Sequence, residues 1–395
     1  MAEQKAPNAP VRIFLVAGEA SGDVLAAELI EPLHERFGGK AVFAGIGGPA
    51  MAAKGVESPI SMSQLSVLGY VEGLMAWWRI SKLAKKTAMM IDEFQADIVV
   101  LVDSWGFTMR VAKAVRALRP QTTLIKYVGP QVWASRPGRA VDLANTVDQL
   151  LTIHAFDAPF YEHTSLPVHF VGNPVLSRQR KGNEAALRKT YKLGPQDKVM
   201  LVLFGSRRAE FSKLQEPFIE AVQIVRAKNP ALTVFCPLSE AIATQVRAAA
   251  INNPRFEGLI FLDEADKEDA FAAADLALAC SGTVTTELAA AAVPMVVGYK
   301  VNPVTWGLLK VFLLKTRFAS LVNVAAKAMI VPEYIQGACQ PEALGAALDT
   351  LLNDETSRAR QQKALADAVD KMGSNGPPTA QRAAEAIHEF WQNRP

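Results

Sequence analysis

The turn GEASGD (18–23) follows an apolar run and precedes a helical pattern, a position where phosphate- and sugar-binding loops often lie. Its two glycines permit a tight turn and a close approach of the backbone to a ligand. Its serine or its aspartate has the right chemistry to cap the helix that follows. The segment therefore predicts either a ligand-binding loop or a well-capped turn, and it lacks the G-x-G-x-x-G spacing of a dinucleotide site. The candidate ligand-binding residues are Gly18, Glu19, Ser21, Gly22 and Asp23.

Two further loops, GSRRAE (205–210) and SGT (281–283), also follow apolar runs and begin helices. Each supplies small residues and backbone N–H groups at a helix start, which suits an anion. Arg207 or Arg208 adds a planar cation for a phosphate, and Glu287 has the chemistry to accept hydrogen bonds from ribose hydroxyls. Either loop alone fits an ordinary capped helix, whereas the two together predict a site for a nucleoside diphosphate. The candidate residues are Gly205, Ser206, Arg207, Ser281, Gly282, Thr283 and Glu287.

Asp103 stands directly after the apolar run that ends at residue 102. A carboxylate in that position is suited to act as a general base on a hydroxyl, a role worth about 10²–10⁴-fold in rate. The alternative is an aspartate that caps the next helix. The five histidines are scattered and no Asp-x-Asp pair follows a strand, so the sequence predicts neither a metal site nor a bound cofactor.

Short apolar runs alternate with helical patterns along almost the whole chain, which indicates an α/β fold. The runs are apolar throughout, as is typical of parallel strands covered by helices on both faces. The expected strands are 11–17, 41–47, 98–102, 124–128, 150–153 and 168–171, then 199–204, 232–236, 259–262, 275–279 and 294–298. The pattern predicts two doubly wound Rossmann-like domains that face a central cleft, with the ligand near the carboxyl ends of the strands.

A polar and basic stretch at 173–189 separates the two sets of expected strands. We therefore expect an N-terminal domain of residues 1–175 and a C-terminal domain of residues 176–375. The last helical pattern, 379–392, has an apolar face suited to pack on the body of the protein. We expect residues 376–395 to complete the N-terminal domain.

The bulk composition excludes several classes of protein. A net charge of +3 is too small to indicate a nucleic-acid binder, which concentrates many more Lys and Arg on one face. The three cysteines are far apart and odd in number, which fits a reducing compartment better than a disulfide framework. With neither a leader-like N-terminus nor an apolar stretch of about 18–20 residues, we expect a cytoplasmic protein.

Residues 73–90 combine large apolar side chains with a basic cluster. The segment contains Trp77 and Trp78 beside Lys82 and Lys85, a combination that suits the interface of an anionic bilayer. A core helix with a solvated basic face is the alternative. The related segment 306–315 favours the core.

Seven segments together resemble the successive signature blocks of the lipid-A-disaccharide synthase family. They are VAGEASGD (16–23), GIGGPAM (45–51), LSVLGYVEGL (65–74), YVGPQVWA (127–134), GSRRAE (205–210), SGTVTTELAAAAVPMVVGYKVNPVTW (281–306) and LVNVAAKAMIVPEYIQ (321–336). The blocks occur in family order and cover most of the chain. The long block that begins at Ser281 and the block that begins at Val16 are specific, whereas single glycine loops are not.

The resemblance implies a B-type glycosyltransferase whose N-terminal domain binds the acceptor and faces the membrane, while its C-terminal domain binds a UDP-sugar without a metal. The implied reaction joins UDP-2,3-diacylglucosamine to 2,3-diacylglucosamine 1-phosphate in lipid A biosynthesis. It inverts the sugar carbon and gives UDP and the β-1,6-linked lipid A disaccharide 1-phosphate. Because the acceptor and the product are membrane amphiphiles, the resemblance implies peripheral association with the cytoplasmic face of the inner membrane. A homodimer is also plausible for the family.

Residue by residue, the resemblance implies roles for several positions. Asp103 matches the family's essential acid and is the candidate base for the acceptor 6-hydroxyl. Arg207 matches the arginine assigned to the diphosphate, and Asn323 matches a polar site residue near the UDP. Glu287 and the turn 281–283 match the nucleotide-binding block.

The chain departs from the family pattern near these positions. The segment after Asp103 has Trp105 and Gly106 in place of a second acid, and Phe204 and Ser135 replace residues common in the family. Two alternatives therefore stay open: a related UDP-sugar transferase with another lipid acceptor, and a non-catalytic UDP-sugar- or glycolipid-binding paralogue. A sugar-nucleotide epimerase is less favoured, because the Trp- and Lys-rich segment has no purpose there.

Overall fold

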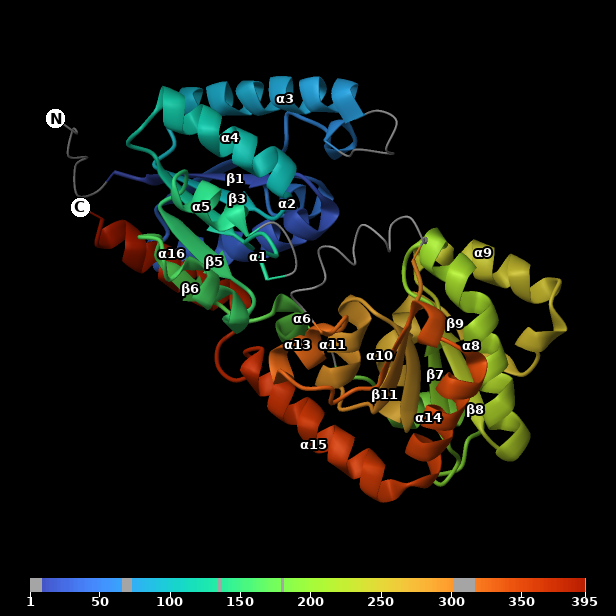
Figure 1. Cartoon of the computed structure of the whole chain (residues 1–395). Coiled ribbons are helices and arrows are strands. Elements are labelled where there is room, and N and C mark those ends of the chain that lie inside the picture. Colours follow the sequence, from blue (N-terminus) through green and yellow to red (C-terminus); the bar gives the residue numbers. More distant parts are fainter. Residues whose placement is uncertain (1–8, 66–72, 134–136, 179–180, 302–316, 395) are drawn as a thin grey trace. The chain divides into compact units, whose positions relative to one another are not determined.

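The computed structural model describes residues 9–65, 73–133, 137–178, 181–301 and 317–394, and of residues 73–77 it describes the backbone alone. The chain divides into two compact units (Figure 1). The first unit is Met1–Pro174 together with Gly376–Pro395, and the second is Val175–Asn375.

The first unit is built on a six-stranded parallel sheet in the order β2-β1-β3-β4-β5-β6. Its strands are β1 Val11–Ala17, β2 Ala41–Ile46, β3 Ile98–Val102, β4 Thr123–Tyr127, β5 Gln149–Thr152 and β6 Val168–Phe170. Helices α3 Gly73–Glu93, α4 Trp105–Leu118 and α5 Gly138–Ala144 cover one face. Helices α1 Ala20–Arg36, α2 Pro49–Ala52 and α16 Thr379–Gln392 cover the other face. With both faces covered, β3 and β4 are buried along their whole length, which explains the apolar sequence of β3 and makes Lys126 of β4 an exception.

The C-terminal helix α16 belongs to the first unit although the second unit precedes it in the chain. It packs beside α1, with Arg36 Nη2 3.1 Å from Glu385 Oε1 (Figure 1). The Gln149 amide of β5 donates a hydrogen bond to the carbonyl oxygen of Ala386 at 3.2 Å. Helix α16 therefore covers sheet surface of the first unit that α1 alone leaves open.

The second unit has its own six-stranded parallel sheet in the order β12-β11-β10-β7-β8-β9. Its strands are β7 Val199–Leu203, β8 Thr233–Pro237, β9 Leu259–Leu262, β10 Leu276–Cys280, β11 Met295–Tyr299 and β12 Glu333–Ile335. Helices α8 Arg208–Lys228, α9 Glu240–Ile251 and α14 Pro341–Asn353 pack on one face. Helices α7 Glu184–Thr190, α10 Lys267–Ala273, α11 Thr283–Ala290, α13 Leu321–Ala326 and α15 Glu355–Lys371 pack on the other.

The described residues of the two units also form short helices in the connections. They are η1 Met62–Gln64, η3 Ala155–Tyr161, α6 Pro174–Arg178, η4 Pro254–Phe256, η5 Glu264–Asp266 and η6 Gln336–Ala338.

The predicted pair of doubly wound parallel sheets is confirmed, and each sheet has a switch point where its strand order reverses. The switch lies between β1 and β3 in the first unit and between β7 and β10 in the second. Loops that follow neighbouring strands on either side of a switch leave a crevice in which ligands bind. Strand β12 was not expected, because it has only three residues. None of the described helices has both the length and the apolar character needed to cross a bilayer.

Candidate active site

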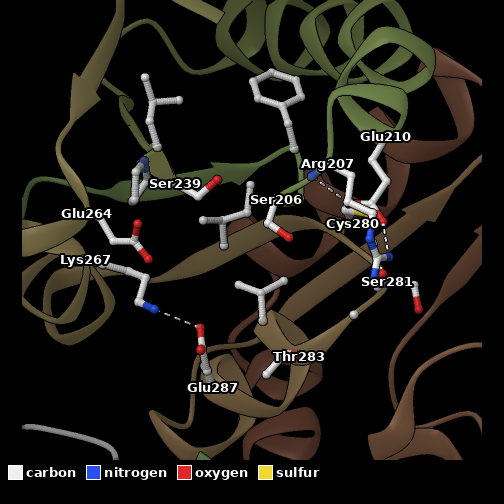
Figure 2. A pocket seen from close by; sticks show the side chains of 17 residues that line it. Ser206, Arg207, Glu210, Ser239, Glu264, Lys267, Cys280, Ser281, Thr283 and Glu287 are labelled. Atoms are coloured by element: carbon white, nitrogen blue, oxygen red, sulfur yellow. Dashed lines mark hydrogen bonds and ion pairs between the residues drawn. The ribbon is translucent and has the colours of Figure 1, made fainter. Parts of the chain in front are cut away.

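A pocket of about 280 Å³ lies at the switch point of the second unit's sheet (Figure 2). The loop after β7 lines it with Gly205, Ser206 and Arg207, and the turn after β10 lines it with residues 281–283. These loops are far apart in the sequence, and they meet because β7 and β10 are neighbours in the sheet. The amino ends of α8 and α11 start at these loops, and the amino end of a helix favours an anionic ligand.

Arg207 is the exposed cation of the loop after β7. Gly205 precedes it with φ +93°, a left-handed conformation that favours glycine. The Arg207 side chain is 78% exposed, and its Nη1 lies 2.9 Å from Glu210 Oε1. The Glu210 side chain is only 12% exposed, but the guanidinium itself lies in solvent, where it is able to exchange the carboxylate for a phosphate.

Gly282, at the start of α11, leaves open space beside the pocket. Its φ of 165° is an extended value that any residue adopts, and a Cβ built there meets no atom within 4 Å. Neither strain nor crowding in the protein therefore requires glycine, while a ligand that approaches the backbone would. The neighbouring Ser281 hydroxyl donates to the carbonyl oxygen of Ala319 at 3.1 Å, so it anchors the turn.

Glu287 lies one turn into α11 and faces Lys267 across the pocket (Figure 2). Its Oε2 is 3.2 Å from Lys267 Nζ, and the two side chains are 25% and 22% exposed. The carboxylate is thus fixed in direction and keeps capacity to accept hydrogen bonds. Lys267 was not predicted from the sequence as a site residue, because α10 reaches the pocket only through the packing of the second unit.

Asp103 lies at the switch point of the first unit's sheet, after β3. The Ser21 hydroxyl, from the start of α1 after β1, donates to Asp103 Oδ2 at 3.1 Å. Asp103 has φ +49° and Ser104 has φ +39°, so two successive non-glycine residues are left-handed. Gly18 makes room for this turn, because a Cβ on it would lie 2.8 Å from Ser104 Oγ. The structure therefore brings the 18–23 turn and Asp103 together, as the strand order requires.

Lys126 lies beneath this turn and was not singled out from the sequence. It is 1% exposed, and its Nζ donates to the carbonyl oxygens of Leu101 and Asp103 and to Thr108 Oγ1. Burial lowers its pKa from 10.5 to about 7, against the opposing charges of Asp103 and Glu19. A single lysine inside an apolar strand was the signal in the sequence, because such a residue needs buried partners.

A separate group of buried polar side chains lies after β5. Asp157 is 3% exposed and accepts a hydrogen bond from the Thr152 hydroxyl, while burial raises the pKa of its carboxyl to about 7. Burial also lowers the pKa of His154 to about 4. His154 is therefore neutral near neutral pH, whereas Asp157 is mostly protonated only below about pH 7.

Comparison with known proteins connects these features to one family. Residues 13–387 match the family model described as lipid-A-disaccharide synthetase. The lipid-A-disaccharide synthase of Paramagnetospirillum magneticum is 39% identical over 380 residues, which cover 96% of this chain and 97% of the relative. That of Rhodospirillum centenum is 38% identical over 379 residues, covering 96% and 94%.

The chain belongs to the lipid-A-disaccharide synthetase family. Solved structures of distant proteins share the fold of this family member. The UDP-N-acetylglucosamine 2-epimerase of Neisseria meningitidis, bound to UDP-GlcNAc, has a TM-score of 0.61 at 12% identity, with 97% of this chain and 100% of that chain covered. MurG from Acinetobacter baumannii has a TM-score of 0.57 at 16% identity, with 97% and 99% covered. At such identities the likeness shows the two-domain glycosyltransferase-B fold alone.

Asp23, a predicted ligand contact, makes its hydrogen bonds within the protein. It is 2% exposed, and its carboxylate accepts hydrogen bonds from the backbone N–H groups of Gly48, Ala50 and Met51 at 2.7, 2.8 and 3.2 Å. These bonds cap α2 and fix the glycine loop before it. Gly22 packs toward the carbonyl oxygen of Val102, whereas Glu19 is exposed at the start of α1.

The Asn323 side chain likewise makes its hydrogen bonds within the second unit. Its side-chain oxygen accepts from the N–H groups of Ile330 and Val331 at 2.9 Å each. Its amide nitrogen donates to Val331 O at 2.8 Å and to Glu333 Oε1 at 2.7 Å. All four hydrogen-bonding positions of this amide are used, and Asn323 does not line the pocket. These hydrogen bonds join α13 to β12, and the nucleotide contact of Asn323 stays a prediction.

Helix α3 divides into a buried face and an exposed face that carries Trp78 and the lysines. Ile80, Ala84 and Ile91 are in the core, so α3 has the buried face that the core interpretation of 73–90 predicts, and the bilayer interpretation stays a prediction. Trp78 is 65% exposed, and Lys82, Lys85 and Lys86 follow it on the exposed face. The side chain of Trp77 and the segment 306–315 lie outside the described residues. Among the described residues, no three His, Cys, Asp or Glu side chains form a potential metal site.

Proposed function

We propose that this protein joins UDP-2,3-diacylglucosamine to 2,3-diacylglucosamine 1-phosphate, giving the β-1,6-linked lipid A disaccharide 1-phosphate and UDP. Membership of the family supports the reaction. The observation that supports it within this chain is the pocket at the β7–β10 switch point, with its exposed arginine, open glycine and fixed glutamate. Such a pocket has a place for a diphosphate and a ribose.

In this proposal the second unit binds the UDP-sugar. The diphosphate lies against the N–H groups of residues 205 and 206 and of the α11 start, where Gly282 leaves room for it. Arg207 leaves Glu210 and binds the phosphate oxygens, so that negative charge on the departing UDP is stabilised without a cofactor. Glu287 accepts hydrogen bonds from the ribose hydroxyls, with Lys267 holding its carboxylate.

Asp103 is the proposed general base of the reaction. The acceptor 6-hydroxyl oxygen forms a bond to C1 of the UDP-sugar while its proton passes to the Asp103 carboxylate. The bond between C1 and the β-phosphate oxygen breaks on the opposite face, and its electron pair leaves with UDP. Attack and departure on opposite faces invert C1. The hydrogen bond from Ser21 supports this role by holding one carboxylate oxygen in place.

The proposal includes peripheral association with the cytoplasmic face of the inner membrane through the exposed face of α3. The support is that Trp78 is largely exposed beside three exposed lysines, a pattern suited to an anionic bilayer interface. The same proposal assigns acceptor binding to the first unit. A homodimer is the expectation from the family resemblance, and light scattering of the purified protein measures it.

The test is UDP release from UDP-2,3-diacylglucosamine, with and without 2,3-diacylglucosamine 1-phosphate in detergent micelles that contain EDTA. We expect release that depends on the acceptor, together with disaccharide formation. Asp103→Asn should lower kcat by about 10²–10⁴-fold while UDP binding stays unchanged. UDP binding without turnover would indicate another acceptor or a non-catalytic protein. Full activity of Asp103→Asn would remove the base assignment alone.

A further inference from the structure

The turn that carries Asp103 has an unfavourable backbone conformation. Asp103 and Ser104 are both left-handed, with φ +49° and +39°, and neither is a glycine. The left-handed conformation is higher in free energy for a non-glycine residue, so the surrounding structure must stabilise it. Such strain is found where a side chain has to point in one direction.

The carbonyl oxygen of Asp103 shows what holds the turn. Because the turn is left-handed, this oxygen is directed toward buried groups on β4 and α4. It accepts hydrogen bonds from Lys126 Nζ and from Thr108 Oγ1, the latter at 2.9 Å. The single Thr108 hydroxyl proton is shared with the carbonyl oxygen of Ser104, which lies 3.0 Å away. An ordinary backbone conformation at Asp103 would give up these bonds.

Lys126 is the centre of this network. Its three N–H groups have three acceptors: Asp103 O, Leu101 O at 3.3 Å and Thr108 Oγ1 at 3.1 Å. It is 1% exposed, so it cannot exchange these acceptors for water. A methionine at this position would fill the same space and leave the Asp103 carbonyl without its lysine partner.

We propose that Lys126 is a positioning residue for Asp103, which holds the left-handed turn so that the carboxylate faces the acceptor hydroxyl. The inference rests on the proposed role of Asp103 as the base. Lys126 itself is too deeply buried to touch a substrate. It acts on the rate by fixing the direction of Asp103.

The protonation of Lys126 gives this role a measurable signature. Burial lowers its pKa to about 7, and the charged groups that face it are Asp103 after β3 and Glu19 before α1. Below this pKa the ammonium has three N–H groups for three acceptors. Above it, the neutral amine has two, and its lone pair faces an oxygen. The turn is therefore held less firmly as the pH rises, and kcat should fall above about pH 7.

The experiment compares Lys126→Met and Lys126→Arg in the full chain, each alone and combined with Asp103→Asn. We expect Lys126→Met to lower kcat by about 10²-fold, since small misplacements of a reacting group cost that much. The Michaelis constant for the UDP-sugar and the affinity for UDP should stay unchanged. Lys126→Arg should recover part of kcat. In the Asp103→Asn background, Lys126→Met should have little further effect, because the base through which it acts is gone.

Lys113→Met is the matched control, because Lys113 pairs with Asp142 on the surface and should not alter kcat. If Lys126→Met does not fold, Thr108→Val takes its place, with Thr108→Ser as its control. Removing this acceptor disfavours the ammonium, so Thr108→Val should move the fall in kcat to lower pH while Thr108→Ser leaves it in place.

Several results would overturn the inference. One is a wild-type kcat that stays flat above pH 7. A second is a plot of kcat against pH for Lys126→Met or Thr108→Val that has the wild-type shape at lower values. A third is a loss of kcat from Lys126→Met that is equal with and without Asp103→Asn. A fully active Asp103→Asn enzyme would instead show that the assignment of the base has failed.

Discussion

Replacing Asp157 with asparagine should make the protein more stable at alkaline pH and leave it nearly unchanged in acid. Burial raises the pKa of this carboxyl from 3.8 to about 7 in the folded state. Its contribution to stability is therefore complete below the unfolded pKa and is lost as the pH rises to the folded value. Asparagine keeps the shape and the acceptor for Thr152 but has no proton to lose.

The structure sets the size of this effect. Each pKa unit is worth about 1.4 kcal/mol, so the shift of Asp157 amounts to at most about 4 kcal/mol above pH 7. For a unit of this size, 1 kcal/mol moves Tm by about 2–4 °C. We expect Asp157→Asn to raise Tm by at most about 8–16 °C at about pH 8, and much less at about pH 4.5.

The assay is calorimetric unfolding of the wild type and the variant at both pH values. His154 has the opposite sign: its lowered pKa gives stability above pH 6.5 that is lost as the pH falls to about 4. Both proteins contain His154, so its contribution cancels in their difference. Asp142→Asn, on an exposed ion pair with Lys113, should show no comparable dependence on pH. An equal difference in Tm at both pH values would refute a neutral Asp157.

Three further changes test other residues. Asp23→Ala should lower the free energy of unfolding by about 2–4 kcal/mol, because one buried and two partly buried N–H groups lose their acceptor. Urea unfolding measures this loss, and its absence would contradict the capping role. Arg207→Ala should weaken UDP binding about 10-fold or more, as measured by titration calorimetry. Arg208 lies outside the pocket lining, so Arg208→Ala should leave UDP binding unchanged. Equal effects of the two substitutions would contradict the assignment of Arg207 to the phosphate. Trp78→Ser should reduce binding of the protein to anionic vesicles. Ile251→Ser, at an exposed site of the second unit, is the control. Unchanged binding of Trp78→Ser would exclude α3 as the surface that contacts the membrane.

The sequence predicted the two sheets because long apolar runs are recognisable without any knowledge of their neighbours. Runs such as 98–102 and 199–203 have to be buried on both faces, and parallel strands between helices are the usual way to achieve that. Only the short strand β12 was not expected. Three residues with one isoleucine give no such run, and this strand forms because β11 offers a free edge.

The candidate loops were also found from the sequence, since glycines and polar residues after a strand are local features. The sequence did not show which residues of these loops face a ligand and which make contacts within the protein. Asp23 and Asn323 look like site residues by type and position, yet their hydrogen bonds go to backbone groups brought near them by folding. A buried polar group takes the partners that packing provides, and the sequence does not say which these are.

By itself, the sequence determined the fold class, the loops at the strand ends and the candidate base Asp103, because each depends on residue types in a local pattern. The tertiary structure decided which loops meet. The strand orders place Asp103 beside Ser21 and the loop after β7 beside Gly282. It also placed Lys126 under Asp103 and Lys267 against Glu287. These contacts join residues from different strands and helices, and their distances depend on how the helices pack on the sheets, which no local pattern encodes.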